Sequence, residues 1–323
     1  MISRRAFLIG ATVLATPLAA VAQQRSVVPR LGVLAQDVQP GLLETLRDEL
    51  EHLGYVEGKG IVTEVRNADG RSDRLPALVG DLLRLRVDVI VAVNTPAAKA
   101  AQNATKAVPI VIMRVADPVK AGLVRSLAHP GANVTGVSFL PDVLGAKSIE
   151  ALSQVVPNLA RVAAFYKGDN PGALLVVTET ERRSAELGVR FERFPVRDPG
   201  DFPDAFTAAA RAGAQAVFVM DDGAMTKMRG PFLKLSSQRS LPVASIYKDF
   251  AEAGGLFAYG PDLDHVYRRA AHYVARVLKG TKPSELPVEE ADRLHFVVNL
   301  KSAKALGLTI PPALLLRANQ VIE

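Results

Sequence analysis

Polar side chains that could hold a small ligand stand directly after apolar, strand-like segments in the first half of the chain. These residues are Gln36 and Asp37, Asn94 and Thr95, and Arg114 with Asp117. The hydroxyl of Thr95 and the backbone N–H groups after it could bind a carboxylate, and Asp117 could bind an ammonium group. We therefore expect a site for a small charged ligand at the ends of these strands.

The second half of the chain repeats this arrangement. Its polar residues after strand-like segments are Lys167, Asp169 and Asn170, then Asp221 and Asp222, then Tyr247 and Lys248. Asp222 is a second candidate to hold an ammonium group, and Tyr166, directly before Lys167, is a further candidate ligand-binding residue. For any one of these residues, in either half, a role as helix cap or turn former explains the residue type equally well.

Residues suited to catalysis are few. The five histidines are dispersed, and His265 and His272 share a predicted helix without the carboxylate of a metalloprotease motif. The glycines of 54–60 lack the spacing of a phosphate loop, and no G-x-S-x-G sequence occurs. Asp221 and Asp222 could bind a metal, but acidic pairs after a strand more commonly cap the next helix. We predict no catalytic residue, metal site or cofactor, and hence no enzyme.

The best-defined structural unit is residues 87–102. The Val/Ile run at 87–93 is typical of a parallel strand that is buried on both faces. We place Thr95 at the N-cap of the following helix and Pro96 in its first turn. A strand-to-helix turn of this kind directs free N–H groups and a small positive potential beyond the end of the strand.

Strands and helices alternate along the whole chain. We predict strands at 30–35, 61–66, 87–93, 108–113, 134–139, 161–166, 216–220, 241–246 and 296–299, and helices at 42–53, 75–85, 171–188, 263–278 and 301–306. Strands that alternate with helices of about ten residues indicate an α/β fold with parallel, doubly wound sheets.

An internal repeat indicates two such units. Arg30 precedes a Pro-Gly pair by the same spacing as Arg161, and the two arginines lie 131 residues apart. The strand at 89–93 matches the strand at 216–220 with an offset of 127, and 108–113 matches 241–246 with an offset of 133. Any two α/β domains look alike at this level, but that alternative also leaves two α/β lobes.

We therefore predict two Rossmann-like lobes that are joined by a hinge of several crossings. The first comprises 30–139 and about 261–288, and the second comprises 140–260 and about 289–323. The elements after residue 263 are too few for a third core. Parallel sheets bind ligands at the carboxyl ends of their strands. Two facing sheets would thus enclose a cleft that the hinge allows to close.

The first 22 residues are typical of an export signal. Ser3-Arg4-Arg5-Ala6-Phe7-Leu8 precedes a short apolar run, and Ala20-Val21-Ala22 offers a cleavage site before Gln23. The paired arginines match the twin-arginine pattern, although an ordinary secretory signal can also contain them. We expect a periplasmic protein that is cleaved near Ala22.

Composition narrows the remaining classes. The 323 residues are 49% hydrophobic and 22% charged, which is ordinary for a globular protein. The chain has no cysteine, which excludes disulfides and thiolate chemistry. The formal charge is +6, but the basic residues are scattered, so we predict no nucleic-acid partner. We expect a monomer.

Several motifs together resemble one known family, the ABC transporter substrate-binding proteins of the tryptophan/tyrosine-uptake-like type. The motifs are the segments at 53–58, 73–76, 87–98 and 109–111, Asp117-Pro118-Val119, Gly122-Leu123-Val124, and the segments at 129–136, 253–260 and 299–312. The resemblance covers about residues 30 to 323. It implies a type I periplasmic-binding-protein fold and a small ligand that is delivered to ABC permease subunits in the membrane.

Two departures from the family pattern affect the expected ligand. The loop at 36–40 lacks the Ser/Gly-rich character common in the family, and Tyr166 with Lys167 stands where members often carry Trp-Asn-Pro, although Asn170-Pro171 is retained. The resemblance therefore implies an amino acid or a related carboxylate, and Arg114 makes an anionic ligand plausible. An exported α/β enzyme and a sensing subunit that docks on a membrane receptor are the alternatives.

Overall fold

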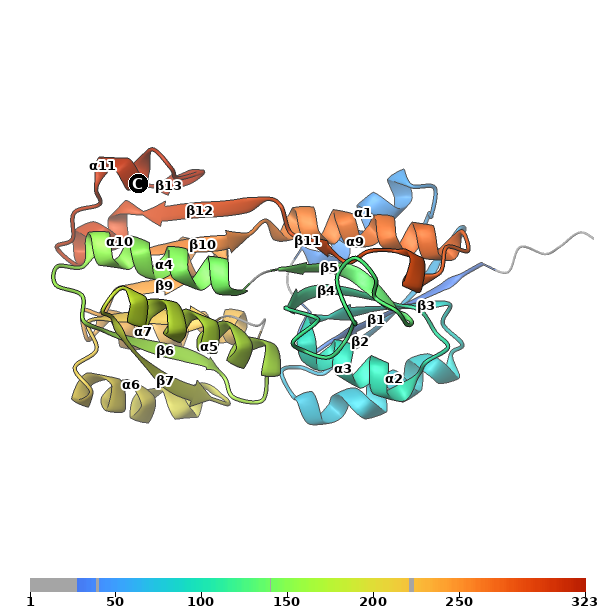
Figure 1. Ribbon diagram of the computed structural model, residues 1–323, viewed down its shortest axis with the longest axis horizontal. Coiled ribbons are helices and arrows are strands. Elements are labelled where there is room, and N and C mark those ends of the chain that lie inside the picture. Colours follow the sequence, from blue (N-terminus) through green and yellow to red (C-terminus); the bar gives the residue numbers. More distant parts are fainter. Residues whose placement is uncertain (1–27, 39–40, 140, 221–223) are drawn as a thin grey trace, which may run out of the picture.

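The computed structural model describes residues 28–38, 41–139, 141–220 and 224–323. The predicted signal segment at 1–22 and the candidate ligand residue Asp222 lie outside these described residues. Two α/β lobes stand side by side, each built around one sheet (Figure 1). Among the described helices, none combines the length and the apolar character that a bilayer crossing requires.

The first lobe holds a six-stranded sheet of order β11-β5-β4-β3-β1-β2, in which every neighbouring pair is parallel. Its strands are β1 (Arg30–Ala35), β2 (Val62–Asn67), β3 (Val89–Val93), β4 (Ile110–Ala116), β5 (Val134–Phe139) and β11 (Glu289–Glu290), and its helices are α1 (Leu42–His52), α2 (Leu75–Arg84), α3 (Asn94–Ala104) and α9 (Leu263–Leu278). Apolar residues cover both faces of this sheet, with α1 and α9 on one face and α2 and α3 on the other.

The second lobe holds a seven-stranded sheet of order β13-β12-β10-β9-β8-β6-β7. Its strands are β6 (Arg161–Lys167), β7 (Arg190–Val196), β8 (Ala216–Met220), β9 (Val243–Ser245), β10 (Phe257–Pro261), β12 (Leu294–Asn299) and β13 (Gln320–Ile322), and its helices are α4 (Pro141–Val155), α5 (Pro171–Glu186), α6 (Phe202–Arg211), α7 (Ala224–Ser237), α8 (Lys248–Glu252), α10 (Leu300–Ala305) and α11 (Pro312–Leu315). The pair β10–β12 is antiparallel, because β10 leads out of this lobe and β12 leads back into it.

The two halves share one topology. The order β2-β1-β3-β4-β5 of the first sheet repeats in the second as β7-β6-β8-β9-β10, which confirms the two Rossmann-like lobes expected from the repeat. The central strands have apolar side chains on both faces, so continuous apolar runs such as β3 and β8 are wholly buried.

Some predicted elements differ from the observed ones. The residue pattern predicted no element at β7, α6 or α7, nor at α4, α8 and β10. Strand β7 lies at the sheet edge, contains Pro195 and buries only Phe191 and Val196, so it lacks a regular alternation. Helix α7 contains Pro231 in its interior, which obscures its periodicity. Strand β4 extends to Ala116, so Arg114 lies within the strand and not in the loop after it.

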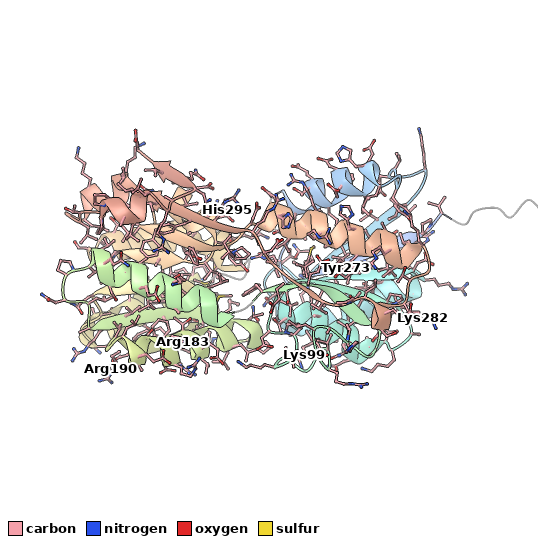
Figure 2. All side chains as sticks on the ribbon, turned by 45° about the horizontal axis from the view of Figure 1, so that its top comes forward. Lys99, Arg183, Arg190, Tyr273, Lys282 and His295 are labelled. Carbon is pink, nitrogen blue, oxygen red and sulfur yellow. The ribbon has the colours of Figure 1, made fainter. Side chains whose placement is uncertain are left out.

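The hinge consists of the chain crossings after β5, between β10 and α9, and between β11 and β12. Asp262 joins two of them, because its N–H donates to the carbonyl of Arg293 (2.9 Å) and its carboxylate contacts His295 Nε2 (3.2 Å) and the N–H of His265 (3.1 Å). Figure 2 shows His295 where the two lobes meet. Burial opposes ionisation of Asp262, but the His265 N–H and the His295 ring outweigh it and hold the pKa of this carboxyl below its usual value.

Candidate ligand-binding site between the lobes

A small cavity of about 10 Å³, which is room for about one water molecule, lies between the carboxyl ends of the two sheets. The first lobe contributes Asn94, Thr95, Arg114, Ala116 and Phe139, and the second contributes Asn170, Gly172, Ala173, Met220 and Tyr247. Typical ligand pockets have about 300–1,000 Å³. The lobes are thus closed tightly on this space, and any ligand larger than a water molecule would require them to part further.

The turn from β3 into α3 forms one wall of the cavity. Asn94 adopts a left-handed backbone conformation (φ 73°), and its side-chain amide donates to Gln36 Oε1 (3.2 Å). Its Oδ1 accepts a hydrogen bond from the N–H of Ala97 (3.4 Å). The prediction of Thr95 as the helix cap was therefore wrong, because the chain enters the helix at Asn94 and the amide of Asn94 takes the capping contact.

Thr95 instead contacts the opposite lobe. It is 2% exposed and lies against Gly172, in the first turn of α5. A methyl group built on Gly172 would lie 2.2 Å from Thr95 Oγ1 and 2.9 Å from Thr95 Cβ. The two helix N-termini can thus meet across the cavity only because residue 172 has no side chain.

Arg114 and Tyr247 form a second contact between the lobes. The β4–β5 register shifts between Ile112 and Val115, and Arg114 at this irregularity has a φ of 57°. Its guanidinium carbon lies 4.5 Å from the centre of the Tyr247 ring, which follows β9 in the other lobe. This is a cation–π geometry, and arginine keeps its charge at any physiological pH. The cavity therefore has a permanent positive charge in its wall.

Asn170 faces the cavity from the start of α5. Its Oδ1 accepts hydrogen bonds from the N–H groups of Gly172 (2.9 Å) and Ala173 (3.3 Å), so it caps the helix and lines the cavity at once. The capping role and the ligand-binding role that the sequence left open are therefore compatible at this residue.

The apolar part of the lining was not predicted. It comprises Ala116, Phe139 and Met220, which are the last residues of β4, β5 and β8, together with Ala173 in the first turn of α5. Their position at strand ends is the signal that could have identified them, but apolar residues at strand ends do not stand out from the apolar strands themselves.

Three predicted ligand residues lie outside the lining. Gln36 is fully buried, and besides the contact with Asn94 it donates to Ser72 Oγ (2.7 Å). Asp117 accepts the N–H of Lys120 (2.9 Å) in a turn after β4, and Tyr166 packs in the hydrophobic core of the second lobe. Asn94, Thr95, Arg114, Asn170 and Tyr247 are the predicted residues that the structure brings together. Within the described residues, no group of three His, Cys, Asp or Glu side chains is arranged to hold a metal ion.

Two facing α/β lobes with a cavity lined from both define a ligand-binding protein of the type I periplasmic-binding-protein fold. The chain belongs to the ABC transporter substrate binding protein family, whose family model matches residues 34–322. This confirms the family resemblance found in the sequence motifs.

Several relatives are similar over most of their length. A tyrosine-binding protein of Clostridioides difficile (strain R20291) is 25% identical over 260 residues, which cover 80% of this chain and 74% of the relative. The structure of an ABC domain from Streptococcus pneumonia in complex with L-Trp has a TM-score of 0.85 and 27% identity, over 91% of this chain and 99% of that one. A conserved domain protein of Vibrio cholerae has a TM-score of 0.84 and 28% identity, with the same coverage.

Proposed function

We propose that this protein is the extracytoplasmic solute-binding component of an ABC importer, which binds a small carboxylate in the cavity between its lobes and delivers it to permease subunits. The observation that carries the proposal is the charged and amide-lined cavity of Arg114, Asn94 and Asn170 at the junction of the two lobes. A guanidinium is suited to carboxylate recognition, since its N–H groups match both carboxylate oxygens.

An aromatic amino acid is the ligand that best fits these features. Relatives bind tyrosine or L-Trp, and here Phe139, Met220 and the Tyr247 ring supply apolar and aromatic surface next to Arg114. In this proposal the carboxylate of the ligand lies against Arg114 and the amides, and its side chain lies against the apolar strand ends. Because the closed cavity is narrow, the lobes must adjust to admit an aromatic ring.

Four related compounds test this arrangement by thermal shift and calorimetry. We expect L-tyrosine, L-tryptophan and 3-(4-hydroxyphenyl)propionate to bind, whereas tyramine, which lacks the carboxylate, does not. A ligand at a hundred times its dissociation constant adds about 2.7 kcal/mol to the free energy of unfolding. Binding of tyramine as strong as that of L-tyrosine would contradict the role of Arg114. Chromatographic recovery of unchanged ligand distinguishes binding from turnover by an enzyme.

We also propose that residues 1–22 direct export and are removed near Ala22. N-terminal sequencing of the mature protein from the periplasm should begin near Gln23. Replacing Arg4 and Arg5 together by lysine should block twin-arginine export and spare ordinary secretion. A cytoplasmic product that retains Met1 would refute export altogether.

A further inference from the structure

Among the described residues, ion pairs join the lobes at several places. Lys248 of α8 lies 3.8 Å from Asp264 of α9, beside the β10–α9 crossing, and two further pairs lie away from that crossing. The first, here named the α5 clasp, is Lys120 in the turn after β4 with Glu179 on α5, where Nζ lies 2.6 Å from Oε1. The second, named the α7 clasp, is Asp37 in the loop after β1 with Lys227 on α7. Each clasp therefore takes one residue from each lobe, and none of these four residues lines the cavity.

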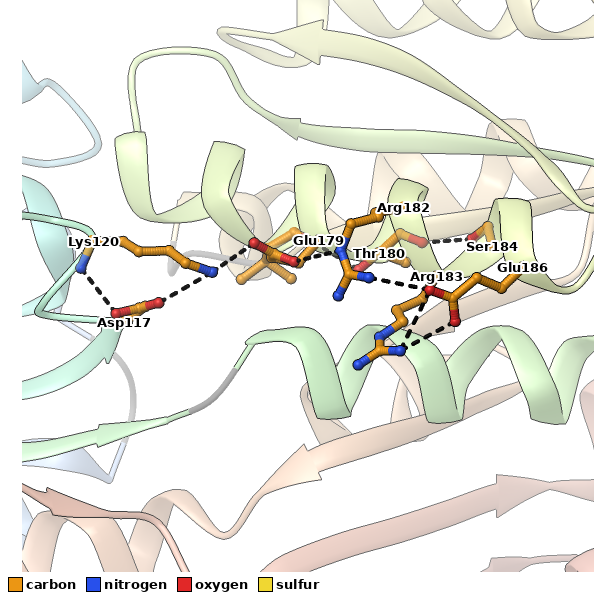
Figure 3. A network of polar contacts seen from close by, with 9 residues as sticks. Asp117, Lys120, Glu179, Thr180, Arg182, Arg183, Ser184 and Glu186 are labelled. Carbon is orange, nitrogen blue, oxygen red and sulfur yellow. Dashed lines mark hydrogen bonds and ion pairs between the residues drawn. The ribbon is translucent and has the colours of Figure 1, made fainter.

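The α5 clasp belongs to a short charged network, which Figure 3 shows. Lys120 Nζ also lies 3.5 Å from Asp117 Oδ2 in its own lobe, and Glu179 Oε2 accepts a hydrogen bond from Arg182 Nε (3.2 Å) in the other lobe. Glu179 is 17% exposed. The hydrogen bond from Lys120 holds the pKa of Glu179 below its usual value, which agrees with an ionised pair.

The α7 clasp covers a buried charge. The Asp37 side chain is 2% exposed, whereas its partner Lys227 is 52% exposed. A carboxylate that is removed from water is costly unless a cation or hydrogen-bond donors compensate it. Since the partnering lysine comes from the opposite lobe, this compensation exists only while the lobes are together. When the lobes part, water can reach the carboxylate.

The sheet order places the two clasps on opposite sides of the cavity. In the first sheet β3 lies between β4 and β1, so the loops that carry Lys120 and Asp37 flank the Asn94–Thr95 turn. In the second sheet β6 and β8 are neighbours, and the helices that follow them, α5 and α7, carry Glu179 and Lys227. Leu175 of α5 adds apolar contact, because it packs against the hydrophobic cluster of the first lobe.

We propose that the two clasps are determinants of ligand affinity outside the cavity, because they stabilise the closed arrangement of the lobes before any ligand binds. The proposal rests on the proposed function only in that a ligand binds between closed lobes. When the binding-competent form is a fraction of the molecules, the apparent dissociation constant rises as that fraction falls. In this proposal the clasps persist while the cavity widens to admit the ligand, so by raising the fraction of closed molecules they tighten binding without touching the ligand.

The size of the effect differs between the clasps. Exposed ion pairs typically change an equilibrium by about 1.4- to 5-fold, so Lys120→Gln should lower the ratio of closed to open molecules by that factor. Lys227→Gln leaves the buried Asp37 without its cation in the closed form, and we expect about a tenfold decrease. Both effects should weaken in 1 M NaCl, where the screening length falls to about 3 Å.

The closed fraction can be measured on the ligand-free protein by single-molecule energy transfer. The chain has no cysteine, so Ala77→Cys on α2 and Ala208→Cys on α6, both at exposed positions of different lobes, give specific labelling. Helices α2 and α6 lie on the side of the molecule away from the β10–α9 and β11–β12 crossings in Figure 1, so their separation should report opening. Lys147→Gln is the matched control, because Lys147 pairs with Glu150 within α4 of one lobe (2.8 Å).

We expect high energy transfer for the ligand-free parent in low salt, and lower transfer for Lys120→Gln, for Lys227→Gln and in 1 M NaCl, with Lys147→Gln unchanged. L-Tyrosine or L-tryptophan should bind the two clasp variants more weakly by the same factor as the closed fraction falls. An open parent at all salt concentrations, or clasp variants that match Lys147→Gln, would overturn the proposal. Affinity that does not follow the closed fraction would overturn it too. Because the transfer measurement needs no ligand, failure of both amino acids to bind would count against the proposed function alone.

Discussion

We expect the substitution Gly172→Ala to weaken ligand binding without weakening the fold of either lobe. The added methyl group would lie 2.2 Å from Thr95 Oγ1, and real contacts of this kind begin at 3.0–3.4 Å, so the helix N-termini must separate by about 1 Å. Overpacking of a well-packed contact costs about 1–3 kcal/mol. That cost applies to the closed form alone, and it corresponds to about a 5- to 150-fold loss of affinity.

In the open form the same methyl group should be harmless or favourable. Gly172 lies in α5 and does not have a positive φ, and alanine is preferred over glycine in helices by up to about 1 kcal/mol. Calorimetry with L-tyrosine or L-tryptophan measures the affinity, and thermal unfolding without ligand measures the stability. The melting temperature of the ligand-free protein should stay the same or rise slightly.

Two other helical glycines provide controls. A methyl group on Gly230 of α7 meets nothing within 4 Å, so Gly230→Ala should change neither measurement. A methyl group on Gly145 of α4 would lie 1.8 Å from Thr180 Oγ1 within the second lobe, so Gly145→Ala should lower the melting temperature. If Gly172→Ala binds like the parent protein, the Thr95–Gly172 contact is not required for binding. If it unfolds as easily as Gly145→Ala, the contact supports the fold and not closure.

Three further predictions concern single side chains. Arg114→Gln should weaken L-tyrosine binding by about 3–5 kcal/mol in calorimetry, because the ligand carboxylate loses its charged partner; unchanged affinity would refute the assignment. In urea unfolding, Tyr273→Phe should lower the free energy of unfolding by about 1 kcal/mol, because the Tyr273 hydroxyl donates to the carbonyl of Pro287. Tyr267→Phe should leave the free energy of unfolding unchanged or raise it, because the buried Tyr267 hydroxyl has no hydrogen-bond partner among the described groups. Asp262 has a lower pKa in the folded protein than in the unfolded chain, so its ionised form adds to the free energy of unfolding above about pH 4. This contribution is lost as the pH falls through the pKa of the folded state. The parent should therefore lose unfolding free energy relative to Asp262→Asn on acidification, and parallel pH profiles would contradict this.

Much of the fold could be predicted because the strands of parallel sheets have a simple sequence pattern. The continuous apolar runs at β3 and β8 mark strands that are buried on both faces, and the similar spacing in the two halves reflects one topology used twice. The carboxyl ends of neighbouring strands converge on one edge, so the polar residues after them could be assigned to a common site. Asn94, Asn170 and Tyr247 meet there for this reason.

The rest of the site depends on features that residue types alone do not reveal. An irregularity in the β4–β5 pairing places Arg114 inside a strand and against Tyr247. Gly136 of β5, which pairs with Ile112 and has a φ of 133°, marks the irregularity, but one glycine in a strand does not reveal which residue of the neighbouring strand is displaced. The entry of the chain into α3 at Asn94 depends on a left-handed backbone conformation, which an asparagine adopts in only some contexts. Asp117 follows β4 as expected, but its carboxylate contacts Lys120 in a turn, and only the three-dimensional structure shows that Lys120 also reaches the other lobe.

The assembly of the first sheet from distant parts of the chain affects how the protein forms during synthesis. Helix α9 covers one face of that sheet, and β11 forms its edge, yet both follow the whole β6–β10 region in sequence. After β5 has left the ribosome, about 150 further residues must be translated before β11 exists, which takes roughly 8–30 s at about 5–20 residues per second. During that interval the apolar side chains of β3, β4 and β5 that face α9 remain uncovered on the nascent chain. This face is therefore the segment that we expect a chaperone to shield until translation nears its end.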